Sequence, residues 1–159
     1  MFDVVVIGSG PAGYVAAIRA SQLGLKTLCI EELSNDKGKP NFGGTCLNVG
    51  CIPSKSLLDS SHRYYEAKKN LSDHGIQLGD VKLDLKTMME RKDNIVSKLT
   101  GGIDGLFLTN KVESICGKGK VISKNTVQID KADGSSEKVD AKNIICLLYT
   151  SPSPRDRSS

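Results

Sequence analysis

The first 30 residues carry the pattern that most restricts the fold of this chain. Residues 3–7 consist of Asp3 and an apolar run of four β-branched side chains, which is typical of a buried parallel strand. A glycine-rich segment, residues 8–13, follows at once and leads into residues 14–23, whose composition favours a helix. Residues 26–30 predict a second strand. Together these segments predict a βαβ unit, which is the usual start of a doubly wound α/β domain.

The glycine-rich segment has the spacing Gly8-x-Gly10-x-x-Gly13. In such a pattern the first glycine permits a tight turn, the second lets the backbone approach a pyrophosphate, and the third lets helix and strand pack closely. Glu31 ends the second strand 18 residues after Gly13, where a ribose-binding acid is expected, and we interpret Glu32 as its solvated neighbour. These residues predict a dinucleotide site without deciding between FAD and NAD.

The rest of the chain predicts two long helices and then several strands. Residues 33–45 are polar and predict a surface loop. The helices are expected from about 51 to 70 and from 84 to 110, and the strands at 112–116, 120–123, 126–129 and 138–146. We interpret these strands as a β-meander inserted after the βαβ start.

Two cysteines, Cys46 and Cys51, lie among glycines just before the first long helix. A disulfide across so short a loop contributes little to stability, because loop-closure entropy favours long loops. A thiolate near a helix N-terminus is stabilised by the helix dipole, which favours a redox role. A zinc site needs closer cysteine pairs and two further ligands, and His62 and His74 are not at ligand spacing. We therefore predict no metal site.

The segment Gly43-Gly44-Thr45-Cys46-Leu47-Asn48-Val49-Gly50-Cys51-Ile52-Pro53-Ser54-Lys55 resembles, nearly residue for residue, the redox-active disulfide of the flavin-dependent disulfide reductases, in their dihydrolipoamide dehydrogenase branch. The resemblance covers about residues 2–145. It implies a Rossmann-like FAD-binding domain with a βαβ start, long helices and an inserted β-meander, incomplete at the C-terminus. The NAD-binding and dimerisation domains of that family would be absent from this chain.

The resemblance also implies roles for individual residues. The fingerprint would hold the ADP half of FAD, Glu31 the adenosine ribose, and Lys55 would lie beside the flavin, while the backbone of Gly119 would face the adenine. The implied catalytic residues are Cys46 and Cys51, and the implied cofactor-binding residues are Gly8, Gly10, Gly13, Glu31, Gly44, Thr45, Lys55 and Gly119.

The implied reaction is the oxidation of protein-bound dihydrolipoamide through a Cys46–Cys51 disulfide and FAD, with hydride passed to NAD. Cys46 would be the interchange thiol and Cys51 the charge-transfer thiolate. The partners implied are lipoyl domains of 2-oxo acid dehydrogenase complexes or of the glycine cleavage system, with a homodimeric full-length parent. The general base of that family, a His–Glu pair in the dimerisation domain, is absent, so we expect this chain to be inactive alone.

Residues 146–159 do not fit the resemblance. The peptide from Cys146 to Asp156 matches the in-frame translation of a transposon-type sequencing adapter. We therefore expect natural sequence to end near Ile145 and the rest to be a non-native tail. A natural disordered Ser/Pro tail is the alternative that the composition permits.

Composition limits partners and location. A net charge of +4 with scattered lysines does not indicate nucleic acid, and no apolar run approaches the ~20 residues of a membrane helix. The first residues show no targeting segment, and five cysteines, an odd number, suit a reducing compartment. These features predict a cytoplasmic, bacterial protein.

Three other functions stay open at this point. Another flavin disulfide reductase, of the glutathione or mercuric type, would share the motifs. A truncated flavin-binding redox module without turnover would need no further domains. A plain NAD-dependent dehydrogenase would leave Cys46 and Cys51 unexplained.

Overall fold

The computed structural model describes residues 1–35 and 38–148. The chain divides into two compact units. One contains residues 1–44 together with the described residues from Gly102 onward, and the other contains Thr45–Gly101. The predicted tail therefore lies outside the described residues from position 149 onward.

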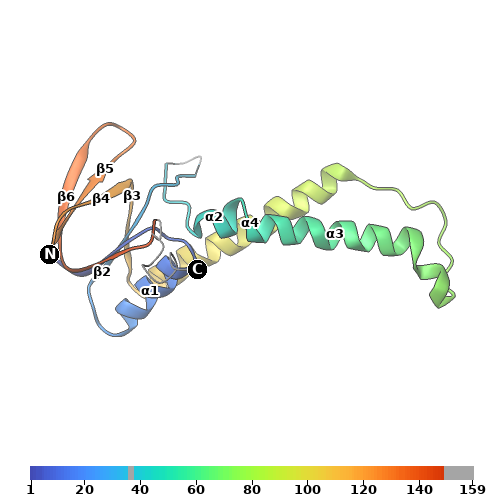
Figure 1. Ribbon diagram of the computed structural model, residues 1–159, viewed down its shortest axis with the longest axis horizontal. Coiled ribbons are helices and arrows are strands. Elements are labelled where there is room, and N and C mark those ends of the chain that lie inside the picture. The colour runs from blue at the N-terminus through green and yellow to red at the C-terminus, as the bar shows by residue number, and fades with distance from the viewer. Residues whose placement is uncertain (36–37, 149–159) are drawn as a thin grey trace, which may run out of the picture. The chain divides into compact units, whose positions relative to one another are not determined.

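The first unit is built on a six-stranded sheet, most of whose strands are labelled in Figure 1. The strand order in this sheet is β3-β2-β1-β6-β5-β4. Its strands are β1 (Phe2–Ile7), β2 (Thr27–Glu31), β3 (Glu113–Cys116), β4 (Lys118–Ser123), β5 (Thr126–Asp130) and β6 (Ser136–Cys146). The strand β6 serves two pairings, because residues 141–146 run parallel to β1 while residues 136–140 pair antiparallel with β5. A parallel layer and a meander are thus continuous through one strand.

One detail of the predicted meander is wrong. The strand β3 does not pair with β4 but runs parallel to β2, with Glu31 opposite Cys116. The physical reason is the connection: a long crossover returns the chain to the same edge of the sheet, which permits parallel pairing. Strand periodicity predicts that a strand exists but does not identify its partner. The meander therefore contains β4, β5 and β6 only.

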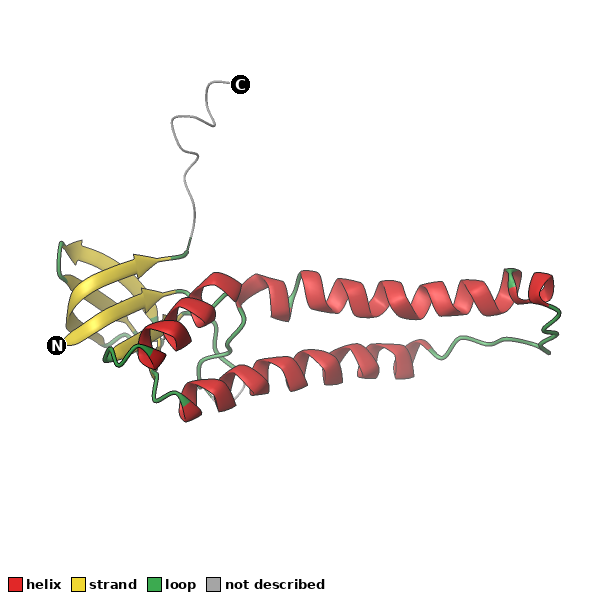
Figure 2. Ribbon diagram, turned by 90° about the horizontal axis from the view of Figure 1, so that it is seen from below, coloured by secondary structure: helices red, strands yellow, loops and turns green. Residues whose placement is uncertain are grey.

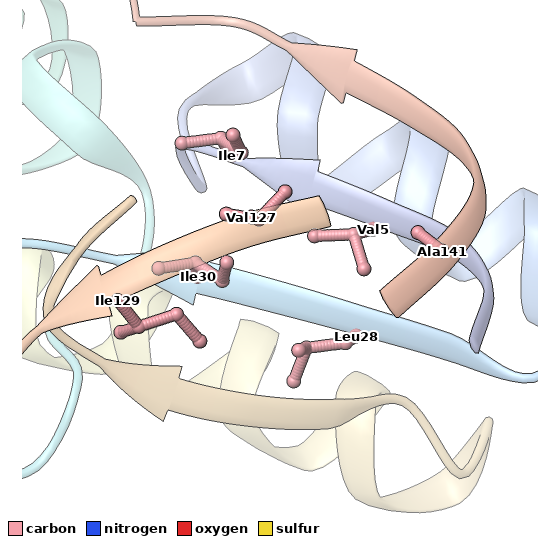
Figure 3. Close-up of a cluster of buried hydrophobic side chains, with 7 residues drawn as sticks. All are labelled: Val5, Ile7, Leu28, Ile30, Val127, Ile129 and Ala141. Carbon is pink, nitrogen blue, oxygen red and sulfur yellow. The ribbon is translucent and has the colours of Figure 1, made fainter. Parts of the chain in front are cut away.

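The core lies between the parallel layer and the meander. Alternate residues of β1 and β2 point to one face, where side chains of β5 and β6 cover them (Figure 3). This cluster consists of Val5, Ile7, Leu28, Ile30, Val127, Ile129 and Ala141. The helix α1 (Pro11–Gln22) packs against β1 and β2. All five residues of β2 are buried, as expected for an interior parallel strand.

The second unit is helical. It contains most of α2 (Gly44–Asn48), then α3 (Cys51–Lys69), the 3-10 turn η1 (Leu71–His74) and the first part of α4 (Leu85–Thr109), whose last residues belong to the first unit. In Figure 2, α3 and α4 run antiparallel. Arg91 of α4 joins them, with Nη2 3.0 Å from Asp59 and Nη1 3.0 Å from Ser56 Oγ.

Both long helices are confirmed to within one residue at each end, and Gly101-Gly102 do not interrupt α4. The short helix α2 is a difference from the sequence prediction, which placed residues 33–45 in a loop and no helix before Cys51. In the part of the chain that the structure describes, no helix has the length and apolar content required to cross a bilayer.

Candidate dinucleotide and redox sites

The glycine fingerprint forms the turn between β1 and α1. Gly8 adopts φ +97°, a left-handed conformation that favours glycine. A Cβ on Gly13 would lie 1.9 Å from the carbonyl oxygen of Gly8, so only glycine lets the helix approach the strand this closely. A Cβ on Gly10 would meet nothing within 4 Å. The turn therefore combines tight packing at Gly13 with an open approach at Gly10.

The N-terminus of α1 fits a phosphate group. Gly10 is its N-cap, Pro11 follows, no side chain caps the helix, and its first turn holds no acidic residue. The first N–H groups of a helix lack intrahelical acceptors and carry the positive end of the dipole. A pyrophosphate suits such an end, and the space over Gly10 lets the backbone meet it.

Glu31 is buried at the carboxyl end of β2, only 8% exposed. Its carboxylate accepts hydrogen bonds from the N–H of Ser9 at 2.9 Å, from the Ser9 hydroxyl, and from the N–H of Leu33 at 2.8 Å. Glu32 is solvated, with its carboxylate 3.8 Å from the ammonium of Lys118. The acid held against the fingerprint is thus Glu31.

The segment Gly43-Gly44 also lies against the fingerprint. The N–H of Gly43 donates to the carbonyl of Ser9 at 3.0 Å. Gly44 has φ +57°, and a Cβ there would lie 2.8 Å from the Cα of Gly10. The glycine at 44 is thus explained by backbone packing beside the dinucleotide loop.

Gly119 has a packing explanation as well. A Cβ on Gly119 would lie 2.8 Å from Cγ2 of Ile7, since β4 crosses closely over the core. Nearby, the N–H of Gly117 donates to the carbonyl of Glu31 at 2.8 Å, which ties the start of β4 to the end of β2. The adenine contact expected of Gly119 stays a prediction.

In the second unit, the two cysteines of the redox prediction lie together. Cys46 is in α2 and Cys51 is the first residue of α3, and both are free thiols. A hydrogen bond between their side chains raises the pKa of Cys46, burial raises it further, and the positive charge of Lys55 opposes the shift. Cys46 therefore keeps its proton to higher pH than an ordinary cysteine.

Gly50 lets the chain turn between the two cysteines. Its N–H donates to the carbonyl of Thr45 at 2.7 Å, and a Cβ there would lie only 3.1 Å from the same oxygen. The carbonyl of Gly50 in turn accepts from the N–H of Ser54 at 3.1 Å in the first turn of α3. This turn brings the end of α2 back to the start of α3. Thr45 contributes its carbonyl here, and its side chain is exposed. Its role in cofactor binding stays a prediction.

The remaining cysteines lie elsewhere. Burial raises the pKa of Cys29 in β2 to about 12, and burial also raises the pKa of Cys116. Cys146 is exposed at the end of β6. His62 and His74 are exposed on α3 and η1, and among the described residues no group of His, Cys, Asp and Glu is arranged to hold a metal ion.

Sequence reasoning missed Ser9, Gly43 and Gly117. Ser9 stood at a variable position of the fingerprint, yet it is fully buried and contacts Glu31. The sequence offered one signal for Ser9, namely a hydroxyl side chain between two glycines at a turn that is expected to be buried. The roles of Gly43 and Gly117 depend on pairings between distant segments, which no local pattern reveals.

The chain is similar to known proteins over most of its length. Residues 2–146 match the family described as "Pyridine nucleotide-disulphide oxidoreductase". Leghemoglobin reductase of Vigna unguiculata is 57% identical over 143 residues, which is 90% of this chain and 26% of that protein. Dihydrolipoyl dehydrogenase 1, mitochondrial, of Arabidopsis thaliana is 56% identical over 90% of this chain and 27% of its own length. Dihydrolipoyl dehydrogenase, mitochondrial, of Sus scrofa is 52% identical over 96% of this chain and 29% of its own length.

The chain thus spans between a quarter and a third of the length of these relatives. The predicted location is wrong: the relatives from Arabidopsis thaliana, Sus scrofa and Pisum sativum are named as mitochondrial proteins of eukaryotes, which points away from a bacterial cytoplasm. The prediction relied on the first residues of a chain that covers only part of its relatives, and those residues carry no information on targeting.

Proposed function

Because this chain belongs to the pyridine nucleotide-disulphide oxidoreductase family, we propose that it is the FAD-binding part of a dihydrolipoyl dehydrogenase. The observation that carries the proposal is the contact between the thiols of Cys46 and Cys51 in a chain that also holds a dinucleotide fingerprint. Relatives named dihydrolipoyl dehydrogenase at 52–56% identity support this activity over glutathione or mercuric reduction.

FAD and NAD are the cofactors that the family implies. When bound, FAD would accept two electrons from the cysteine pair and supply a hydride to NAD. In our proposal the N–H groups at the start of α1 bind the pyrophosphate, with the space at Gly10 allowing its approach. Glu31 accepts a hydrogen bond from a ribose hydroxyl, and Lys55 places a positive charge near the cysteine pair.

The cysteine pair oxidises the substrate dithiol in two steps of thiol–disulfide exchange. A thiolate of the substrate dithiol attacks Sγ of Cys46 in the Cys46–Cys51 disulfide, and Cys51 leaves as a thiolate. The second substrate thiolate then attacks the substrate sulfur bound to Cys46, so that a cyclic disulfide forms and Cys46 leaves. Once Cys46 has left, its raised pKa favours the thiol over the thiolate. Two electrons have then passed from the substrate to the cysteine pair.

The partners we propose are lipoyl domains of 2-oxo acid dehydrogenase complexes or of the glycine cleavage system, together with a second copy of the full-length parent. We propose residues 1–145 as the natural sequence of the FAD-binding domain and residues 146–159 as a non-native tail, whose first residue, Cys146, still pairs with Ile7 at the end of β6. The NAD-binding and dimerisation domains would lie in the rest of the parent. On this proposal the 159-residue chain does not turn over alone.

The test is NAD-dependent oxidation of dihydrolipoamide by the full-length parent, with variants numbered as in this chain. Cys46→Ser and Cys51→Ser should each lower kcat by at least about a thousandfold, because either change removes the disulfide. The matched control Cys116→Ser should keep kcat within about twofold. Retained activity in Cys46→Ser, or a preference for glutathione disulfide over lipoamide, would refute the proposal.

A further inference from the structure

We propose that Ser9 is a positioning residue of the dinucleotide site, which orients the carboxylate of Glu31 toward a ribose hydroxyl. The inference rests on the proposed function, since it assumes an adenosine ribose at Glu31. Ser9 is fully buried between Gly8 and Gly10, and its side chain reaches the end of β2.

The hydrogen bonds around Ser9 have a fixed direction. The N–H of Gly43 points at the hydroxyl oxygen of Ser9, with 3.3 Å between the nitrogen and Oγ. A backbone N–H only donates and an ionised carboxylate only accepts. The single hydroxyl proton of Ser9 must therefore be donated to Oε2 of Glu31. The two hydrogen bonds therefore run in one direction, from Gly43 to Ser9 and from Ser9 to Glu31.

These contacts leave the carboxylate able to accept one more hydrogen bond. A carboxylate has about four acceptor positions. Among the described contacts, Ser9 fills two with its N–H and its hydroxyl, both at Oε2, and the N–H of Leu33 fills one at Oε1. The remaining position is thus assigned to Oε1, and a hydroxyl donor of the ligand suits it.

The hydroxyl of Ser9 is not required to satisfy its neighbours. Without it, the N–H of Gly43 still donates to the carbonyl of Ser9 at 3.0 Å. Glu31 still accepts from the N–H groups of Ser9 and Leu33. Ser9→Ala therefore leaves no buried polar group orphaned, and we expect it to fold. The variant loses the fixed orientation of the Glu31 carboxylate, and this loss should change how tightly a ribose hydroxyl binds.

The experiment is calorimetric titration of the 159-residue chain with ADP and with 2′-deoxy-ADP and 3′-deoxy-ADP. Loss of a hydrogen bond to a charged acceptor should weaken binding of one deoxy analogue about tenfold or more in the wild type. In Ser9→Ala that ratio should fall to about threefold or less. The control Thr27→Val removes another buried hydroxyl, in the same β2, and should leave the ratio unchanged.

A purely structural role for Ser9 would weaken ADP and its deoxy analogues equally, which would overturn the inference. The double variant Ser9→Ala/Glu31→Gln should show the same ratio of affinities for ADP and the deoxy analogue as Glu31→Gln alone, because both changes act on one carboxylate. Independent, additive losses would also overturn the inference. If the wild type binds neither FAD nor ADP, the proposed function of this chain fails and the inference fails with it.

Discussion

Gly13→Ala should destabilise the first unit through a backbone clash that no side-chain rotation can relieve. The new Cβ would lie 1.9 Å from the carbonyl oxygen of Gly8 and 2.8 Å from its carbonyl carbon. Ordinary van der Waals contacts of a Cβ are 3.4–4 Å, so α1 must move away from β1 by roughly 1.5 Å. The contacts of α1 with β1 and β2 are loosened by that movement.

The net cost can be estimated from two opposing effects. Overpacking of this kind costs about 3 kcal/mol. Alanine in a helix returns up to about 1 kcal/mol relative to glycine. The expected loss is therefore about 2 kcal/mol in the free energy of unfolding. With a urea dependence of about 2 kcal/mol per molar, the midpoint falls by about 1 M.

The assay is urea unfolding followed by far-ultraviolet circular dichroism, with Gly10→Ala as the matched variant. Gly10 has φ −61° and ψ 179°, which any residue adopts, and a Cβ there meets nothing within 4 Å. Gly10→Ala should keep the midpoint within about 0.3 M and yet weaken FAD binding at least about tenfold, because its methyl group stands where a phosphate approaches. Equal midpoints for Gly13→Ala and wild type would refute the packing argument.

Three further changes have expected outcomes. Lys111 has φ +58°, so Lys111→Gly should raise the free energy of unfolding by about 0.5–1 kcal/mol in urea titrations; a decrease would contradict the strain. Burial raises the pKa of Cys29 to about 12 in the folded state, so above about pH 9 the thiol ionises only in the unfolded state. The free energy of unfolding should therefore fall from about pH 9 toward pH 12. At pH 10.5 this loss is about 2 kcal/mol, and it should be missing from Cys29→Ala; an unchanged pH slope would refute it. Cys51→Ala should lower the pH midpoint of Cys46 alkylation, and Lys55→Ala should raise it, as measured by mass spectrometry of the peptide holding Cys46; opposite shifts would contradict the assigned causes.

Much of the fold could be predicted because its signals are local. The strand from Phe2 to Ile7, the fingerprint turn and α1 are adjacent in sequence, and each follows from hydrophobic pattern or glycine spacing. The long helix α4 was predictable from its apolar periodicity, despite Gly101-Gly102. The pairing of β3 with β2 was not, because the pattern of a strand does not name its neighbour.

The candidate sites divide in the same way. Glu31 could be predicted from its distance in sequence, but its hydrogen bonds with Ser9 join segments 22 residues apart. Gly44 and Gly119 were expected as cofactor residues from resemblance alone. The structure adds a packing reason for both, against the backbone of Gly10 and the side chain of Ile7.

That addition changes how glycines in such a chain should be interpreted. A glycine whose missing Cβ would collide with protein, such as Gly13 or Gly119, is required by the fold whether or not a ligand binds. A glycine such as Gly10, with extended backbone and open space around it, has no structural requirement of its own. We therefore expect Gly10 to be the fingerprint residue whose identity depends most on a ligand, because a phosphate that approaches the backbone there would meet a side chain.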